Sequence, residues 1–425
     1  MFSAVLIVIV FLTIMLGVPI TFALGLVSLA GLLIKGLPPI VLVQRLFTAV
    51  DSFPLVAIPL FILAGALMSE GGVSRRLVRL ADALVGHLPG GLAMVVIVAT
   101  AFLSAVTGSA IAAAAAIGGI MIPALTSQGY SPRFSAALVA SAGTMGPIIP
   151  PSIPLVIYGV ITGTSIAKLF LSGFVPGILM AIALSVPAYF TSVKCGYRGR
   201  ATKASLREVL DALKDAFLPL LSPIIIIGGI LGGFFTATES AVVAAAFTFV
   251  LGFFFYRELK LSDLPRVFRD TAVSTGTVLI VLGTASVFTW FLTVQQAPKA
   301  ITEFLMSVSQ SKLVLLMLIN VILLFVGTFI DTISALTIFT PLFYPVALRF
   351  GVDPIHLGMI IAVNLTIGMI TPPLGVCLFV SSNIAKVTLS EMLNDLKPLL
   401  LALLVVLVLV TYIPEITLFL PKLFP

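Results

Sequence analysis

Two short segments of this 425-residue chain combine helix-breaking residues with free oxygen atoms, a combination that suits ion binding inside a protein. They run from Ser141 to Ser152 and from Asn364 to Pro373. Proline lacks an amide donor, so each proline here leaves a carbonyl one turn earlier without a hydrogen bond. Such carbonyls coordinate Na⁺, and the positive N-terminus of a following helix attracts an anion. Two kinked helices that only pack closely are the alternative, but a break that occurs twice favours a binding site.

Asp331 is the clearest single acid, because it lies at the centre of a long apolar block. An ionised carboxylate at membrane depth costs several kcal/mol unless it has a partner. A cation such as Na⁺ is the simplest partner; protonation and a salt bridge to a neighbouring helix are the alternatives.

The two histidines, His87 and His356, and the two cysteines, Cys195 and Cys377, are isolated from one another. They therefore predict neither a metal centre nor a disulfide.

A polar segment, Thr236–Ser240, separates two apolar stretches. Thr, Ser and Glu in this order are typical of an N-terminal helix cap, here for a helix that starts at Ala241. A role in ion coupling is the alternative.

The two proline-containing segments belong to a repeat with a period of 222 residues. Residues 123–151 and 345–373 align without a gap, and nine of the 29 positions are identical. Six of these nine are Gly or Pro. Ser109 corresponds to Asp331 when the same register is extended toward the N-terminus. Two copies of a broken apolar helix in corresponding halves indicate the binding site of a secondary transporter.

The composition predicts an all-α polytopic membrane protein, with the lipid bilayer as its surroundings. The chain is 60% hydrophobic and 9% charged, with a mean hydropathy of +1.26, whereas soluble domains carry roughly 25% charged residues. Its apolar runs have the length of about 17–25 residues that a membrane span needs. The net charge of +7 comes from Lys and Arg in short loops, as the positive-inside rule requires, and predicts no nucleic-acid partner.

The sequence holds none of the common hydrolase motifs. It contains no phosphate-binding loop of the form Gly-x-x-x-x-Gly-Lys-Ser/Thr, no His-Glu-x-x-His and no Gly-x-Ser-x-Gly. We therefore expect a protein that neither hydrolyses ATP nor acts as an enzyme.

Three basic stretches constrain the topology: Arg75–Arg79, Lys194–Lys214 and Arg257–Arg269. If all three are cytoplasmic, an even number of membrane crossings separates each from the next. Residues 90–125 break this parity unless they enter and leave the membrane on one side. We therefore predict a re-entrant hairpin with its tip at Thr107–Ser109, because irregular backbone at membrane depth is tolerated where it faces protein or water.

A second hairpin is predicted at residues 313–347, with its polar centre at Gly327–Thr332. The crossing at 271–292 places it on the opposite membrane face, as an inverted repeat requires. The predicted units are 1–214, with hairpin 90–125 and broken helix 134–161, and 215–425, with hairpin 313–347 and broken helix 356–382. The apolar N-terminus lacks a cleavage site, so we expect a first membrane segment there. The repeat favours two short helices, around Gly17-Val-Pro19, over one long helix in residues 1–34.

These motifs resemble a known family. Thr107-Gly-Ser109, Ala142-Gly-Thr-Met-Gly-Pro-Ile-Ile-Pro-Pro-Ser152, Gly232-Gly-Phe-Phe-Thr-Ala-Thr-Glu-Ser240 and Thr371-Pro-Pro-Leu-Gly375 occur in the order found in the large membrane subunit of tripartite ATP-independent periplasmic (TRAP) transporters. The resemblance spans nearly the whole chain. It implies an inverted-repeat, elevator-type ion-transporter fold in the bacterial inner membrane. It also implies Na⁺-coupled uptake of an organic acid, a soluble periplasmic binding protein, and a small four-helix membrane subunit as a separate chain.

The resemblance also implies site residues, with Na⁺ as coupling ion and no other cofactor. One Na⁺ site would comprise Ser104, Ser109, Gly143, Thr144 and Pro147, and the other Gly327, Asp331, Thr332, Asn364 and Gly368. The substrate would contact Thr107, Gly108, Ser109, Pro150, Ser152, Thr366, Thr371 and Pro372. No intramembrane arginine pair stands out to bind a carboxylate, so we expect helix N-termini and hydroxyls to bind it.

Two alternatives stay open at this point. The first is a stand-alone Na⁺/carboxylate or Na⁺/H⁺ transporter of related fold, and the second is a channel-like pore or a scaffold subunit without transport of its own. The substrate is equally open among C4-dicarboxylates, sialic acids, 2-oxo acids and other sugar acids.

Overall fold

The computed structural model describes residues 2–424, and all regular elements in this range are helices. The chain begins with two short helices, as the repeat favours, because Gly17 has a left-handed φ of +87° and Pro19 follows it. The N-terminal helices are α1 (Phe2–Met15), α2 (Ile20–Ile34), α3 (Ile40–Val50), η1 (Phe53–Val56) and α4 (Ala57–Glu70).

Two series of helices then follow in the same order, shifted by the predicted 222 residues. The shift holds at both ends of α7 and α16. The first series is α5 (Val73–Val85), α6 (Gly91–Thr107), α7 (Ala110–Ser127), α8 (Pro132–Gly143), α9 (Ile153–Thr162) and α10 (Ile166–Cys195). The second is α14 (Ala297–Val308), α15 (Lys312–Gly327), α16 (Thr332–Arg349), α17 (Pro354–Gly368), α18 (Val376–Ala385) and α19 (Leu389–Tyr412).

The remaining helices join and complete these series: α11 (Leu206–Leu231), α12 (Ala237–Val250), η2 (Leu251–Phe255), α13 (Leu264–Val294) and α20 (Glu415–Leu423). The cap predicted before α12 is confirmed, but the helix begins at Ala237 and not at Ala241. Thr236 is its N-cap and accepts the Glu239 amide at 3.2 Å, while the Glu239 carboxylate accepts the Thr236 amide at 2.7 Å. This reciprocal pair starts the helix four residues early.

Each predicted hairpin consists of two packed helices. α6 and α7 are joined by Gly108 and Ser109, and Gly108 has a left-handed φ of +61° that favours glycine. α15 and α16 are joined by the turn 328–331. Serine and aspartate occupy equivalent places, since Ser109 is the N-cap of α7 and Asp331 is the N-cap of α16.

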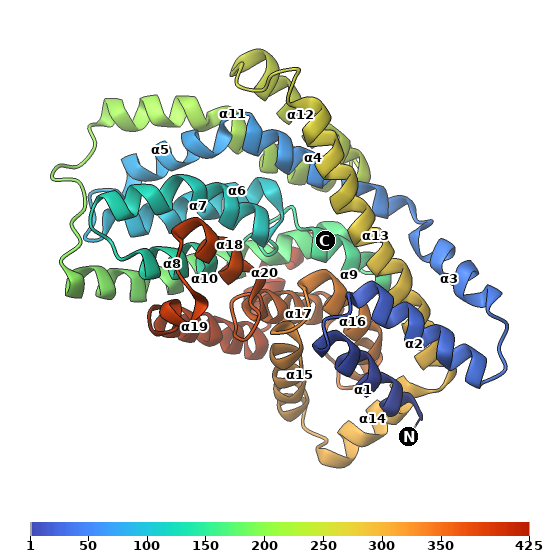
Figure 1. Ribbon diagram of the computed structural model, residues 1–425. Coiled ribbons are helices and arrows are strands. Elements are labelled where there is room, and N and C mark those ends of the chain that lie inside the picture. Colours follow the sequence, from blue (N-terminus) through green and yellow to red (C-terminus); the bar gives the residue numbers. More distant parts are fainter. Residues whose placement is uncertain (1, 425) are drawn as a thin grey trace.

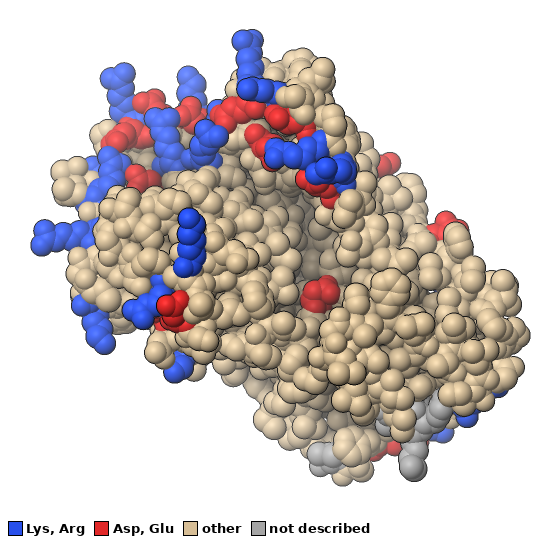
Figure 2. Space-filling view, in the orientation of Figure 1, with Lys and Arg blue, Asp and Glu red and all other residues tan. Residues whose placement is uncertain are grey.

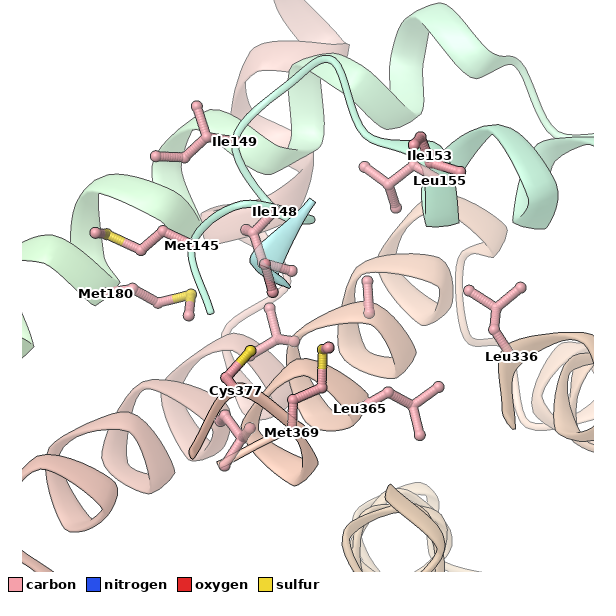
Figure 3. Close-up of a cluster of buried hydrophobic side chains, with 14 of the residues drawn as sticks. Met145, Ile148, Ile149, Ile153, Leu155, Met180, Leu336, Leu365, Met369 and Cys377 are labelled. Carbon is pink, nitrogen blue, oxygen red and sulfur yellow. The ribbon is translucent and has the colours of Figure 1, made fainter. Parts of the chain in front are cut away.

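Both predicted broken helices are broken. The first is interrupted between α8 and α9 and the second between α17 and α18, and each break contains a cis Pro–Pro bond. The distal halves cross over: α9 packs against α16 and α17 of the second series, and α18 packs against α7 and α8 of the first (Figure 1). Figure 3 shows Ile148 of the first break pointing toward Met369 and Cys377 of the second. These three buried side chains fasten the two breaks to each other.

Two groups of helices surround this crossing. The core, α6–α10 with α15–α19, holds the hairpins and broken helices. The frame consists of α2–α4 and α11–α13, in which α13 packs against α2, α3 and α4, and α12 against α4 and α11. Figure 1 shows α2, α3 and α13 on the right and α6, α7 and α8 on the left.

Within residues 2–424, eight helical stretches are long and apolar enough to span a membrane. This supports the prediction of a polytopic membrane protein. Two of them, α7 and α16, are legs of the hairpins, whereas the opposite legs α6 and α15 have 17 and 16 residues. The re-entrant path of each hairpin stays a prediction.

The three basic stretches lie on one face of the molecule, joined by ion pairs. Arg79 pairs with Asp215, Arg76 with Glu258 at 2.7 Å, and Arg200 with Asp82 at 3.5 Å. Figure 2 shows Lys and Arg, interspersed with Asp and Glu, gathered along the upper and left edges, above a hollow in which an acidic side chain is visible. One shared face is what the positive-inside rule requires of cytoplasmic loops.

The contact between each break and its own hairpin depends on a glycine. A Cβ atom at Gly368 would lie 2.6 Å from the carbonyl carbon of Gly327, and one at Gly146 would lie 2.6 Å from that of Ser109. These neighbours are backbone, so they cannot move aside. We expect Gly368→Ala to lower the unfolding temperature of the purified protein, at a cost of about 1–3 kcal/mol from overpacking.

Gly119→Ala is the matched control, because Gly119 lies within α7 and a Cβ there meets no heavy atom within 4 Å. It should unfold at or above the wild-type temperature. Equal unfolding temperatures for Gly368→Ala and Gly119→Ala would show that the close approach of Gly368 to Gly327 does not affect stability.

Candidate functional site

The two hairpin tips and the two breaks meet at one cavity of about 90 Å³. Residues from the first half and the second half lie on its wall together. The lining residues are Gly108, Ser109, Ala110, Ile111, Pro147, Ile153, Pro154, Asp331, Thr332, Ile333 and Met369. A water molecule occupies about 30 Å³ of liquid, so the cavity has room for an ion and one small polar group.

Three helices begin at this cavity. The first residues of α7, α9 and α16 line it, and their N-caps are Ser109, Ser152 and Asp331. The unpaired amides of a helix start carry a partial positive charge. The starts of α7 and α9, which have neutral serine caps, favour an anion there, whereas the Asp331 carboxyl group caps the start of α16.

The Asp331 carboxylate is bound within its own hairpin. It accepts the backbone amides of Ile333 and Ser334 at 3.0 and 3.1 Å, and also the Ser334 hydroxyl. Among residues 2–424, no Lys, Arg or His forms an ion pair with it. The salt-bridge alternative is therefore not realised in this part of the chain, and Asp331 lies on the cavity wall.

One predicted residue of the first Na⁺ site, Ser104, and one residue that was not predicted, Ser141, have buried oxygens without partners. The hydroxyls of Ser104 and Ser141 are fully buried and have no hydrogen bond to any described residue. Thr144 donates to the Ser141 carbonyl at 2.6 Å. A Cβ at Gly143 would lie 3.0 Å from the Ala110 carbonyl oxygen, so the break runs close to the start of α7. Unpaired buried oxygens also occur elsewhere in the described chain, among them those of Ser28, Ser192 and Ser222, so what distinguishes Ser104 and Ser141 is their place on a hairpin and a broken helix.

The second predicted Na⁺ site repeats this arrangement in the other half. The Thr332 hydroxyl and the side-chain oxygen of Asn364 are buried and unpaired within the described chain. Gly327, at the end of α15, lies in backbone contact with Gly368, at the end of α17. Both sites thus place unpaired oxygens beside a glycine-mediated contact between a hairpin and a break.

The predicted site residues fall into two groups in the structure. Gly108, Ser109, Pro147, Asp331 and Thr332 line the cavity. The others lie behind its wall or away from it: Ser104, Thr107, Gly143, Thr144, Pro150, Ser152, Gly327, Asn364, Thr366 and Gly368 are buried, Thr371 is half-buried, and Pro372 is exposed.

Several protein hydroxyls that were predicted to contact the substrate already donate hydrogen bonds within the protein. Those of Thr107, Thr366 and Thr371 donate to carbonyls of their own helices at 2.9–3.2 Å. Ser152 donates to the Pro147 carbonyl and thereby closes the loop of the first break. These groups shape the backbone around the cavity.

A larger cavity of about 340 Å³ separates the core from the frame. α9 and α16 form its core side, further along the same helices that begin at the small cavity, and α3 and α13 form its frame side. Hydroxyls of Ser286, Thr289, Thr293 and Thr337 line it together with Trp290. The Arg45 guanidinium lies 4.8 Å from the centre of the Trp290 ring. Sequence reasoning missed this arginine, although its position inside the apolar stretch 40–50 was a visible signal.

Sequence reasoning also missed Ser141, Asn320 and Ser334. Ser141 and Ser334 lie within motifs that we had singled out, and their serine side chains were the available signal. Asn320 lies inside an apolar helix far in sequence from both breaks, and its contact with Asn364 depends on tertiary packing.

The fold is that of a known class of membrane transporters. The crystal structure of the YdaH transporter from Alcanivorax borkumensis superimposes with a TM-score of 0.60 over 87% of this chain and 87% of that one, at 16% sequence identity. At this identity the likeness concerns the fold alone.

The sequence identifies the family within this class. The model of the DctM component of tripartite ATP-independent periplasmic transporters matches residues 7–416, and the chain belongs to this family. It is a large permease subunit of a TRAP transporter and not an enzyme. Such permeases are multi-pass proteins of the inner membrane, which agrees with the eight candidate spans. The family works with a small membrane subunit and a periplasmic binding protein. The resemblance drawn from the motifs is thereby confirmed.

Relatives of the chain cover it almost completely. It is 45% identical over 413 residues to the protein YgiK of Salmonella typhimurium, covering 96% of this chain and 94% of that one. It is 42% identical to the isethionate TRAP transporter permease protein DctMQ of Oleidesulfovibrio alaskensis, covering 95% of this chain and 64% of that one. It is 40% identical to the sialic acid TRAP transporter large permease protein SiaM of Vibrio cholerae, covering 96% of each.

The unpaired hydroxyls predict an unusual response to mutation. Removing a buried hydroxyl without a partner removes no hydrogen bond, so we expect Ser141→Ala to keep or raise the unfolding temperature in Na⁺-free buffer. Ser172→Ala is the control, because the buried Ser172 hydroxyl donates to the Leu169 carbonyl at 2.7 Å. It should cost about 1 kcal/mol. A larger loss for Ser141→Ala than for Ser172→Ala would contradict the assignment of Ser141 as unpaired.

Proposed function

We propose that this permease couples Na⁺ entry to the import of an organic acid, which a periplasmic binding protein delivers to it. The main support is the set of unpaired buried oxygens on the hairpins and broken helices: those of Ser104 and Ser141 in the first half, here called the first oxygen cluster, and those of Thr332 and Asn364 in the second half, here called the second oxygen cluster. A bound Na⁺ in each cluster would supply the missing partner. Two clusters beside one cavity would then couple ion binding to substrate binding.

The donor types favour Na⁺ over a proton or a divalent cation. Hydroxyl, carbonyl and amide oxygens dominate both clusters, and Asp331 is the single carboxylate beside them. Divalent cations generally require more carboxylate ligands. The first cluster, Ser104 and Ser141, contains no titratable group among its unpaired oxygens, so a proton could replace the ion only at Asp331.

The cavity favours an anionic group of the substrate. The serine-capped starts of α7 and α9 face it, and it is large enough for a carboxylate or sulfonate. The names of the relatives give C4-dicarboxylate, sialic acid and isethionate as substrates, which are all organic anions. The remainder of such a substrate would extend toward the larger cavity, where hydroxyls and Arg45 are available.

We propose an elevator movement of the core against the frame. The larger cavity lies between these two bodies, while each hairpin is fixed to its break by backbone contacts at glycines. The hairpins and breaks would therefore move together with the ions and the substrate. The small four-helix subunit, as a separate chain, would extend the frame.

Uptake into proteoliposomes tests this function directly. The permease, its small subunit and its binding protein would be combined, and labelled C4-dicarboxylate, sialic acid and isethionate offered with and without an inward Na⁺ gradient. We expect accumulation of one of these acids that requires both the gradient and the binding protein. Accumulation without the binding protein would favour a stand-alone carrier, and uptake indifferent to Na⁺ would overturn the coupling.

Asp331→Asn separates ion coupling from folding. Asn is as good an N-cap as Asp, so the hairpin should fold, while the loss of the carboxylate charge should raise the Na⁺ concentration for half-maximal uptake by about 10-fold or more. Asp353→Asn is the matched control: Asp353 caps α17 by accepting the amides of Ile355 and His356 at 2.8 and 3.3 Å, and it lies outside the cavity. If both variants respond to Na⁺ like the wild type, Asp331 has no part in the site.

A further inference from the structure

We propose that Asn320 is a positioning residue, which orients the side chain of Asn364 so that its oxygen points toward the second oxygen cluster. Thr411 in turn fixes the orientation of Asn320. This inference rests on the proposed function, because it assigns a purpose to that cluster as a cation site. It adds a residue that does not line the cavity.

A buried line of hydrogen bonds carries the argument. It connects α15, α17 and α19 through Asn320, Asn364 and Thr411, of which the last two are fully buried and Asn320 is 9% exposed. The Asn364 amide nitrogen donates to the backbone oxygen of Asn320 at 3.0 Å and to its side-chain oxygen at 2.8 Å. The Asn320 amide nitrogen donates to the Thr411 hydroxyl oxygen at 2.8 Å.

Each hydrogen bond in this line fixes which group donates and which accepts in the next, starting from Thr411. Thr411 has one hydroxyl proton, which it donates to the Leu407 carbonyl at 2.7 Å, so toward Asn320 it acts as an acceptor. Asn320 must therefore present its nitrogen to Thr411 and its oxygen to Asn364. Asn364 must present its nitrogen to that oxygen, because the opposite orientation would place two oxygens in contact.

This arrangement leaves the Asn364 oxygen unpaired at the cation site. It is buried and has no hydrogen-bond partner in residues 2–424. Asn364 lies one turn before Gly368, on the same face of α17, and Gly368 contacts Gly327. Asn320 lies two turns before Gly327 on α15, on the face that meets α17. The line of bonds and the glycine contact thus belong to one helix interface.

The first half of the chain has no equivalent of this line. In the repeat register Asn320 corresponds to Val98 and Asn364 to Ala142. Comparison of the two halves therefore gives no indication of it.

The alternative is a purely structural role, in which the line only holds α15, α17 and α19 together. Breaking the line would then lower stability and leave Na⁺ affinity unchanged.

Thermal unfolding of the purified full-length chain distinguishes these roles without a transport substrate. NaCl would replace choline chloride at constant ionic strength, and the rise in unfolding temperature with Na⁺ gives an apparent Kd. We expect Asn320→Leu to raise this Kd about 10-fold, the range for groups that orient metal ligands. Thr411→Val, which releases Asn320 and preserves side-chain shape, should raise it in the same direction by less.

Thr417→Val provides the matched control. The Thr417 hydroxyl is equally buried, donates to the Pro414 carbonyl at 3.0 Å and contacts the His356 ring nitrogen at 2.8 Å, but it does not contact Asn320. It should leave the Na⁺ Kd at the wild-type value even if it lowers the unfolding temperature in choline. Asn320→Asp, which keeps an acceptor for Asn364, should restore Na⁺ affinity relative to Asn320→Leu.

Two results would overturn the inference, and they are distinguishable. If Asn320→Leu unfolds at a lower temperature in choline but keeps the wild-type Na⁺ Kd, the line of bonds is purely structural and the proposed function is untouched. If the wild-type protein shows no rise in unfolding temperature with Na⁺, the cation site itself is refuted, and the proposed coupling is refuted with it.

Discussion

The architecture depends on the requirement that every backbone polar group inside a membrane find a partner. An intact helix meets this requirement within itself, whereas a helix broken at membrane depth does not. The first break of this chain is buried inside the core, and the second is buried up to Ile370, where the neighbouring hairpin covers it, while Pro372 to Leu374 are exposed. Gly146 and Gly368 permit that cover, because any side chain at either place would collide with the backbone of the hairpin. The oxygens that the breaks set free are thereby kept from lipid and directed toward an internal cavity.

Duplication supplies two such arrangements, but the two halves have diverged in chemistry. The equivalent N-caps are a neutral serine in the first hairpin and an aspartate in the second. The first oxygen cluster is neutral, while the second adds an asparagine whose orientation is fixed from outside the cluster. If both clusters bind Na⁺ as proposed, this difference in chemistry would make them fill at different Na⁺ concentrations.

Local features of this protein were predictable from its sequence, and features that arise from packing were not. Proline and glycine act on their own backbone, so the repeat register, both breaks and both hairpins follow from their positions. Capping is equally local, although the reciprocal bond between Thr236 and Glu239 starts α12 earlier than the apolar pattern alone suggests. The crossing of α9 and α18 between the halves, and the contact of Asn320 with Asn364, join residues distant in sequence. No periodicity encodes them.

The same crossing explains why the hairpins can act as one unit. Each distal half-helix packs on the hairpin of the other half, and Ile148, Met369 and Cys377 fasten the two breaks together. A shift of one hairpin therefore carries the other with it, since close-packed interiors transmit displacement and do not absorb it. The space of about 340 Å³ between core and frame separates α9 and α16 of the core from α3 and α13 of the frame. Rigidity within the core is one property that the proposed elevator movement requires.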